Sequence, residues 1–391
     1  MNKTVFILSL CQALLGTGNI LLVAMAALIG LTLAPSDALI TLPLALQFVG
    51  LMTATIPASL IMKKLGRRKG FYLGNSFGIV GAVCCSIALM YNSFLGFCGG
   101  SFLLGMGIGF GTLYRFAAVE SCSVEQKSTA ISMVMLGGVL AAFLGPALAV
   151  ESKDWIAAYP FSGSFIGVAI LNIVAFMLLT QANFKEVNRQ DDRHLTQRPL
   201  SVIIRQPIFL LSIVAAISSY VVMNLLMSAT PLAMHHHGFS FNDSAWVIQW
   251  HVLGMFLPSF FTGKLIARYG AIKLIQTGAV FILGCIAINY DGQSIWHFWS
   301  ALVLLGVGWN FMFISATHMV TSAYNADEKA KSQAANEFML FSMVALSALS
   351  SGWLVSSIGW TKMNLLMVAL VLLSILVVWL YSHKIDIAIT K

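Results

Sequence analysis

The segment SLIMKKLGRRK, residues 59–69, places five basic residues between two long apolar runs. A weaker copy, GKLIARYG at residues 263–270, returns about 204 residues later. A short basic turn cannot lie in hydrocarbon, and it marks the side of the membrane on which it sits. Its recurrence at about half the chain length predicts two related halves.

The composition is that of a polytopic membrane protein. Of the 391 residues 59% are hydrophobic and only 9% are charged, with a mean hydropathy of +0.87, whereas a soluble chain carries about 25% charged residues. The net charge of +8 lies in short loops between apolar runs, which indicates contact with membrane lipid rather than with nucleic acid. The six cysteines have no C-x-x-C spacing, so we expect no disulfide framework, no metal site and no cofactor.

Apolar runs long enough to span a bilayer recur twelve times. We expect spans at 5–33, 39–62, 71–91, 94–117, 129–150, 159–181, 207–233, 243–266, 271–290, 296–320, 333–357 and 361–383. The polar stretch after the sixth run is too hydrophilic to cross. The predicted fold is an all-α membrane protein whose twelve transmembrane helices form two pseudo-symmetric six-helix halves, 1–182 and 207–391, joined by a linker at 183–206.

Charge placement predicts the orientation. With a cytoplasmic N-terminus, all of the 22 Lys and Arg except Lys153 and Lys362 fall on the cytoplasmic side, as the positive-inside rule requires. We therefore expect a multi-pass protein of the bacterial inner (plasma) membrane with both termini cytoplasmic. A second repeat supports the two halves: LGMG at 104–107 matches LGVG at 305–308, and a polar loop follows each helix.

These features together resemble the major facilitator superfamily over the whole chain. Its signature after helix 2 is G-x-L-A-D-R-x-G-R-R, of which Gly66, Arg67 and Arg68 stand here, while Ser59 and Lys63 replace the first glycine and the aspartate. Gly145-Pro146 is similar to the start of the family's antiporter motif, without its second glycine pair. Ser101 stands where drug exporters carry an arginine, which argues against a multidrug antiporter.

The strings TLYRFAAVE and TPLAMHHHGF look like a bacterial branch of the family for which uptake of riboflavin or of siderophores has been proposed. The resemblance implies alternating access and a cavity lined by helices 1, 4, 7 and 10.

Charged residues at the predicted inner helix ends are candidates for a conformational latch. Gly66 makes the turn between helices 2 and 3, and Arg67 or Arg68 would pair with Glu120 when the cytoplasmic side is closed. The two arginines have an alternative role as topology anchors beside anionic lipid. Glu337 would pair with Arg268 or with Lys63, or else it is a favourable anion near a helix N-terminus.

Polar side chains at membrane depth are the candidates for solute binding. Arg115 could hold an anionic group, or its side chain could extend to lipid head groups. Asn19, Asn224 and Asn310 lie in cavity-lining helices, and their alternative role is a helix–helix hydrogen bond. Trp309 could stack on a ring of the solute.

Histidines are the candidates for proton coupling, because no acidic residue lies near the middle of a span. His251 and His318 lie inside predicted spans, and a histidine pKa lies near neutrality; packing roles are the alternative. His235, His236 and His237 end a helix outside the membrane and favour a loop cluster over a metal site, since adjacent residues point in different directions.

The sequence predicts a secondary active transporter that moves a small organic solute across the inner membrane by alternating access, coupled to protons as a symporter or antiporter. Uptake of riboflavin or a siderophore-like compound, rather than drug or metabolite efflux, is the alternative, and facilitated diffusion stays open. A channel or receptor would not require the repeat, and an enzyme would require clustered acids and histidines or a nucleotide motif, which is absent. We expect a functional monomer.

Overall fold

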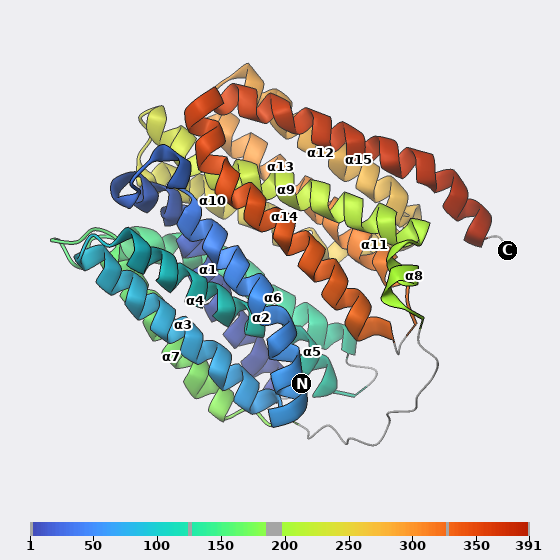
Figure 1. The fold of residues 1–391 in the computed structure, drawn as a ribbon, viewed down its shortest axis with the longest axis horizontal. Helices are drawn as coiled ribbons and strands as arrows, with labels where there is room; N and C mark the ends of the chain where they lie inside the picture. The colour runs from blue at the N-terminus through green and yellow to red at the C-terminus, as the bar shows by residue number, and fades with distance from the viewer. Residues whose placement is uncertain (1–2, 124–126, 185–197, 326–327, 390–391) are drawn as a thin grey trace. The chain divides into compact units, whose positions relative to one another are not determined.

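A computed structural model describes residues 3–123, 127–184, 198–325 and 328–389, and every regular element within these ranges is helical (Figure 1). The elements are α1 (Lys3–Leu33), η1 (Asp37–Leu39), α2 (Leu42–Leu65), α3 (Arg67–Met90), α4 (Phe94–Gly111), α5 (Tyr114–Glu120), α6 (Lys127–Ser152), α7 (Ser162–Thr180), α8 (Leu200–Ile204), α9 (Pro207–His236), α10 (Phe241–Phe256), α11 (Ser259–Tyr269), α12 (Ala271–Asp291), α13 (Ile295–Val320), α14 (Lys329–Ile358) and α15 (Trp360–Ile389).

Eleven helical segments within the described ranges are long and apolar enough to cross a membrane. The eighth expected span, 243–266, is not one continuous helix as predicted. It is the pair α10 and α11, interrupted at Leu257 and Pro258, because a proline has no N–H to donate and its ring clashes with the carbonyl four residues earlier. The fourth span is also jointed, since α4 ends at Gly111 and α5 begins at Tyr114.

The two halves repeat the same helix pairings. In the first half α1 packs on α6, α2 on α4, and α3 on both α4 and α7. In the second half α9 bonds to α14, α11 packs on α13, and α12 packs on both α13 and α15. The predicted two-fold repeat is thus present in the packing as well as in the sequence.

Matched glycines explain why these pairings recur. A Cβ on Gly105 would overlap the carbonyl of Gln47, and one on Gly306 would overlap the carbonyl of His251. These two glycines occupy the same place in the LGMG and LGVG repeats, so each lets its helix approach a neighbouring backbone at the same point. Gly145 does the same for α6 on α1, where a Cβ would lie 2.9 Å from Ile20 Cβ.

The two basic turns share one backbone conformation. Gly66, between α2 and α3, has φ 88° and ψ 158°, and Gly270, between α11 and α12, has φ 86° and ψ 151°. Side chains strongly disfavour such positive φ values. The turn-making role predicted for Gly66 is therefore visible in its dihedral angles.

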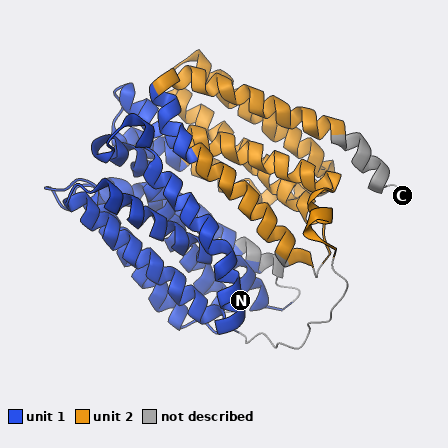
Figure 2. Ribbon diagram, in the orientation of Figure 1, with its two compact units in different colours: residues 1–188, 228–249, 348–356 blue, residues 189–227, 250–347, 357–391 orange. Residues whose placement is uncertain are grey.

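The chain forms two compact units (Figure 2). Unit 1 comprises 1–188 with Ser228–Gln249 and Ala348–Ser356, and unit 2 comprises 189–227, Trp250–Ser347 and 357–391. Within unit 1, the Thr41 hydroxyl donates to the Leu349 carbonyl (3.1 Å) and accepts from the Gly352 N–H (3.2 Å). The boundaries predicted for the two halves stay a prediction.

Candidate functional site

An aromatic cluster from three helices lies in unit 2, and we call it the aromatic site. Trp309 and Phe313 of α13 are stacked, with ring centroids 4.8 Å apart and planes at 14°. Tyr220 of α9 stands edge-on to both rings at 5.4 Å, and its ring centroid lies 5.9 Å from that of Phe341 in α14. Such stacked and edge-on geometries are the favoured ones for aromatic pairs.

Trp309 has an unused hydrogen-bond donor in this cluster. Its side chain is only 6% exposed, and its indole Nε1 has no acceptor among the described residues. A buried indole N–H usually finds a partner. The aromatic site therefore combines flat apolar rings with one unused donor, a combination that suits a planar ring that carries a carbonyl group.

Glu337 lies close to the aromatic site. It is half-buried, one turn before Phe341 in α14, and its carboxylate interacts electrostatically with Tyr220. Glu337 lies eight residues after the start of α14 at Lys329, which is about two turns into the helix and not in its first turn. Its proposed pairing with Arg268 or Lys63 stays a prediction.

Asn19 and Asn224 both make helix–helix hydrogen bonds. The amide of Asn224 in α9 donates to Ser347 Oγ (2.9 Å) and to the Val344 carbonyl (3.3 Å) of α14. Asn19 in α1 accepts a bond from Gln47 Nε2 of α2 at 2.5 Å. Asn224 is buried and Asn19 is half-buried, so Asn19 is the more accessible of the two.

Asn310 holds the break between α10 and α11. Its Nδ2 donates to the Met255 carbonyl (2.6 Å) and to Ser259 Oγ (2.7 Å), and its Oδ1 accepts from Thr262 Oγ1 (2.6 Å). The interruption at Pro258 frees the carbonyls before it, and Asn310 of α13 satisfies one of them. Asn310 is fully buried, so its amide serves the joint between helices.

Arg115 and Arg268, which are candidates for solute binding and for the latch, are both exposed. Arg115, at the start of α5, lies 4.9 Å from the ring of Phe116, and Arg268, at the end of α11, lies 5.2 Å from the ring of Tyr269. Neither has a carboxylate partner within the part of the chain that the structure describes. Arg115 is thus available either to an anionic solute or to lipid.

The two candidate histidines differ in burial. His251 is fully buried, and its Nδ1 lies 2.8 Å from the Leu302 carbonyl. Since a carbonyl can only accept, Nδ1 carries the proton and Nε2 is left as an acceptor, for which the described residues supply no donor. His318 is exposed near the end of α13. In the described ranges no three His, Cys, Asp or Glu side chains are arranged to hold a metal ion.

The structure brings Arg67 and Glu120 together. Arg67 Nη2 lies 2.6 Å from Glu120 Oε1, and Nε lies 3.0 Å from Oε2. Arg68 instead donates to the Ala182 carbonyl at 2.6 Å. The bidentate pair joins α3 to α5 within unit 1, and its action as a latch stays a prediction.

Glu120→Gln is expected to increase modification of the native Cys122, which lies two residues beyond and is half-exposed. A surface ion pair stabilises one state by about 1 kcal/mol or less, so the rate of maleimide labelling should rise by about fivefold at most. High salt should reduce the difference. Glu151→Gln, at the opposite end of unit 1, is the matched control. Equal labelling of the parent and Glu120→Gln would show that the ion pair between Arg67 and Glu120 does not control opening of the cytoplasmic side.

Tyr220, Phe313 and Phe341 of the aromatic site were not predicted from the sequence as solute-binding residues. Phe313 and Phe341 sit in long apolar runs where phenylalanine is common. The only local signal is the spacing of Trp309 and Phe313, four residues apart and hence on one helix face. The part played by Tyr220 depends on helices far apart in the sequence.

Known proteins match this architecture. The sequence profile of the Major Facilitator Superfamily matches residues 8–347 and, in a second match, 212–387. The riboflavin transporter RfnT of Brucella anthropi is 40% identical over 379 residues, which cover 96% of this chain and 95% of that protein. An uncharacterised transporter of the same superfamily, YdeG of Bacillus subtilis, is 28% identical over 97% of this chain and 92% of its own.

Solved structures agree on the fold. A D-xylose–proton symporter superposes with a TM-score of 0.79 over 96% of this chain and 97% of its own, at 14% identity. At that identity the likeness concerns the fold alone. With the profile match and the Brucella relative, it confirms the predicted all-α membrane fold, and the chain belongs to the Major Facilitator Superfamily of membrane transporters.

Proposed function

We propose that this transporter takes up riboflavin or a closely similar flat, ring-bearing solute. The observation that carries the proposal is the 40% identity to a riboflavin transporter across nearly the whole of both chains. It favours the uptake alternative over drug or metabolite efflux. The predicted cytoplasmic termini, the inner membrane and the monomeric state belong to this proposal as well.

The chemistry of the aromatic site supports such a solute. Riboflavin has a planar, uncharged ring system with carbonyl groups, and a chain of hydroxyl groups. The stacked Trp309 and Phe313 provide a surface on which a ring can stack, and Trp309 Nε1 has a hydrogen bond to give. Binding is then governed by stacking and one directional bond rather than by net charge.

A siderophore-like anion is the second candidate, and Arg115 is the observation that favours it. An exposed guanidinium without a described carboxylate partner suits a carboxylate or phosphate group. Riboflavin would make no use of that charge. Arg115→Gln should therefore leave riboflavin uptake within about twofold of the parent, and it should abolish uptake if the solute is anionic.

Growth of a bacterium unable to make riboflavin tests the proposed uptake. Cells that express this chain should grow at external riboflavin concentrations too low for cells with an empty vector, and should accumulate labelled riboflavin with saturable kinetics. If the protein is present in the membrane and neither growth nor accumulation rises, riboflavin is not the solute.

His251→Gln tests proton coupling. We propose that the Nε2 position of His251 takes the transported proton, because it is the one unused basic nitrogen of a buried ring. Glutamine can still donate toward the Leu302 carbonyl and cannot take a proton at neutral pH. In vesicles with an imposed pH gradient, the variant should retain solute exchange and lose gradient-driven accumulation.

The matched control is His318→Gln, because His318 is exposed near a helix end. Gradient-driven accumulation by His251→Gln at the level of the parent would make His251 a packing residue. The same loss in His318→Gln alone would move the coupling role to that residue.

A further inference from the structure

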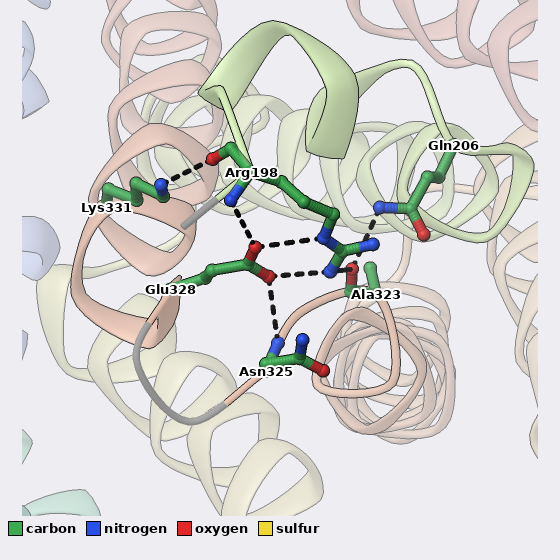
Figure 3. A network of polar contacts seen from close by, with 6 residues as sticks. All are labelled: Arg198, Gln206, Ala323, Asn325, Glu328 and Lys331. Carbon is green, nitrogen blue, oxygen red and sulfur yellow. Dashed lines mark hydrogen bonds and ion pairs between the residues drawn. The ribbon is translucent and has the colours of Figure 1, made fainter. Parts of the chain in front are cut away.

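The best-satisfied carboxylate among the described residues lies outside the aromatic site and outside the membrane spans. Glu328, just before α14, is only 2% exposed. It accepts bonds from Arg198 Nε (2.9 Å), from Arg198 Nη2 (2.6 Å) and from the Arg198 backbone N–H (2.9 Å). Figure 3 shows these bonds between Arg198 and the carboxylate of Glu328. Two charge-assisted bonds in a fork are the strongest arrangement for such a pair.

Glu328 is also a helix cap. Its Oε2 accepts the Asn325 N–H at 3.0 Å, and its own N–H bonds back to the Asn325 carbonyl at 3.1 Å. The first of these bonds is one half of a capping box, in which a glutamate side chain accepts the backbone N–H three residues before it, and the second is a backbone turn. The bonds from Arg198, followed by that of Asn325, hold the pKa of the Glu328 carboxyl at about 2. The group therefore stays charged at any pH that a cell experiences.

Three more hydrogen bonds hold the same end of the linker. Lys331 Nζ, in the first turn of α14, donates to the Arg198 carbonyl at 2.5 Å. Gln206 Nε2 and Arg198 Nη2 both donate to the Ala323 carbonyl, at 2.9 and 3.2 Å. Residues 198–206 are thereby attached to the loop that joins α13 to α14 (Figure 3).

The other end of the linker is fastened to unit 1. Thr4 Oγ1 donates to the Asn183 carbonyl (3.1 Å) and accepts the Asn183 N–H (3.0 Å), and Arg68 donates to the Ala182 carbonyl. Each end of the linker is thus held by the unit to which it belongs, and residues 185–197 join the two fastened ends.

The repeat between the halves is broken at this point. Arg67, which follows Gly66, supplies the guanidinium for Glu120, but the residue that follows the matching Gly270 is Ala271. In the second half an arginine of the linker, Arg198, pairs instead with Glu328 of the loop before α14. We propose that Arg198 and Glu328 form a clamp that fixes the end of the linker to the start of α14 and so positions α14 for transport.

The clamp has a functional consequence through α14. That helix carries Phe341 of the aromatic site and Ser347, the partner of Asn224. The clamp touches neither, so Arg198 and Glu328 are positioning residues, and losing the clamp should slow the transport cycle rather than weaken solute binding.

Amide hydrogen exchange of the purified transporter tests the clamp without any solute. Arg198→Met removes the guanidinium and leaves the bond from the Asn325 N–H to Glu328 intact, while Glu328→Gln weakens both the ion pair and that bond. Exchange at 198–206 should become roughly three- to tenfold faster in Arg198→Met, as for the loss of one bonded network, with no change in α3 or α4. Arg205→Met, an exposed neighbour, is the control and should match the parent.

Three results would overturn the clamp. The first is exchange like the parent in Arg198→Met while Glu328→Gln opens the first turn of α14, which would make Glu328 only a helix cap. The second is unchanged exchange at 198–206 in both variants. The third is equal exchange in Arg205→Met and Arg198→Met, which would make the effect one of general charge.

Transport kinetics provide the second readout. Where the parent takes up riboflavin, Arg198→Met should lower the maximal rate about threefold or more and keep KM within about twofold, since no solute contact is lost. A raised KM at an unchanged maximal rate would contradict a positioning role. If the parent does not take up riboflavin, the proposed solute fails, whereas the exchange experiment still decides on the clamp.

Discussion

Trp309→Ala should raise the KM of riboflavin uptake about tenfold or more, because stacking of a ring on an aromatic side chain contributes roughly 1–3 kcal/mol. The indole also supplies the unused Nε1 donor. Trp309→Phe should give an intermediate KM, since it restores the stacking surface and not the hydrogen bond. Initial rates in whole cells at graded riboflavin concentrations measure both effects.

Trp296→Ala is the matched control for this prediction. Trp296 lies on the same helix, α13, and is 65% exposed near its start, so its removal should leave KM unchanged. An unaltered KM in Trp309→Ala, with normal amounts of protein in the membrane, would remove the aromatic site from solute binding. A loss of folded protein in both Trp309 variants would make Trp309 a packing residue.

Asn310→Leu should destabilise the transporter by about 2–3 kcal/mol, because it leaves three partners unsatisfied and membrane hydrogen bonds contribute roughly 0.6–1 kcal/mol each. The partners are the Met255 carbonyl, Ser259 and Thr262. Among the described residues, Asn310 is the only side chain of α13 that bonds to the Met255 carbonyl, and the joint between α10 and α11 would lose this bond. The thermal midpoint in detergent should fall by about 2–4 °C.

Thr262→Val gives a graded comparison at nearly constant volume, because it removes one of the three bonds of Asn310 together with the bond from Thr262 Oγ1 to the Pro258 carbonyl. Its thermal midpoint should fall by less than that of Asn310→Leu. A midpoint unchanged in Asn310→Leu would show that the helix break does not depend on Asn310, which would return this residue to the solute-binding candidates.

The repeated elements could be predicted from sequence because their signals are local. Gly66 and Gly270 each mark a turn, and the two L-G-x-G strings each mark a close helix approach. In these cases a short motif contains the physical reason. The pairing of Arg67 with Glu120 was also expected, since Arg67 begins one helix and Glu120 ends another on the same predicted membrane face.

The helix break and the clamp lack such local signals. The sequence around Pro258, HVLGMFLPSFF, is mostly apolar, so hydropathy cannot separate a kinked span from a broken one. The amide that supports the break comes from another helix. Arg198 and Glu328 are 130 residues apart. Their contact depends on tertiary packing, and so does the convergence of Tyr220, Trp309 and Phe341.

Counterflow in proteoliposomes is the most direct measurement of the proposed function. Vesicles that contain the purified protein and are loaded with unlabelled riboflavin should take up labelled riboflavin transiently above its equilibrium level, and excess external riboflavin should abolish the overshoot. A channel or receptor cannot produce that overshoot. Uptake no greater than in protein-free vesicles, with protein shown to be folded by its thermal transition, would contradict riboflavin transport by this chain.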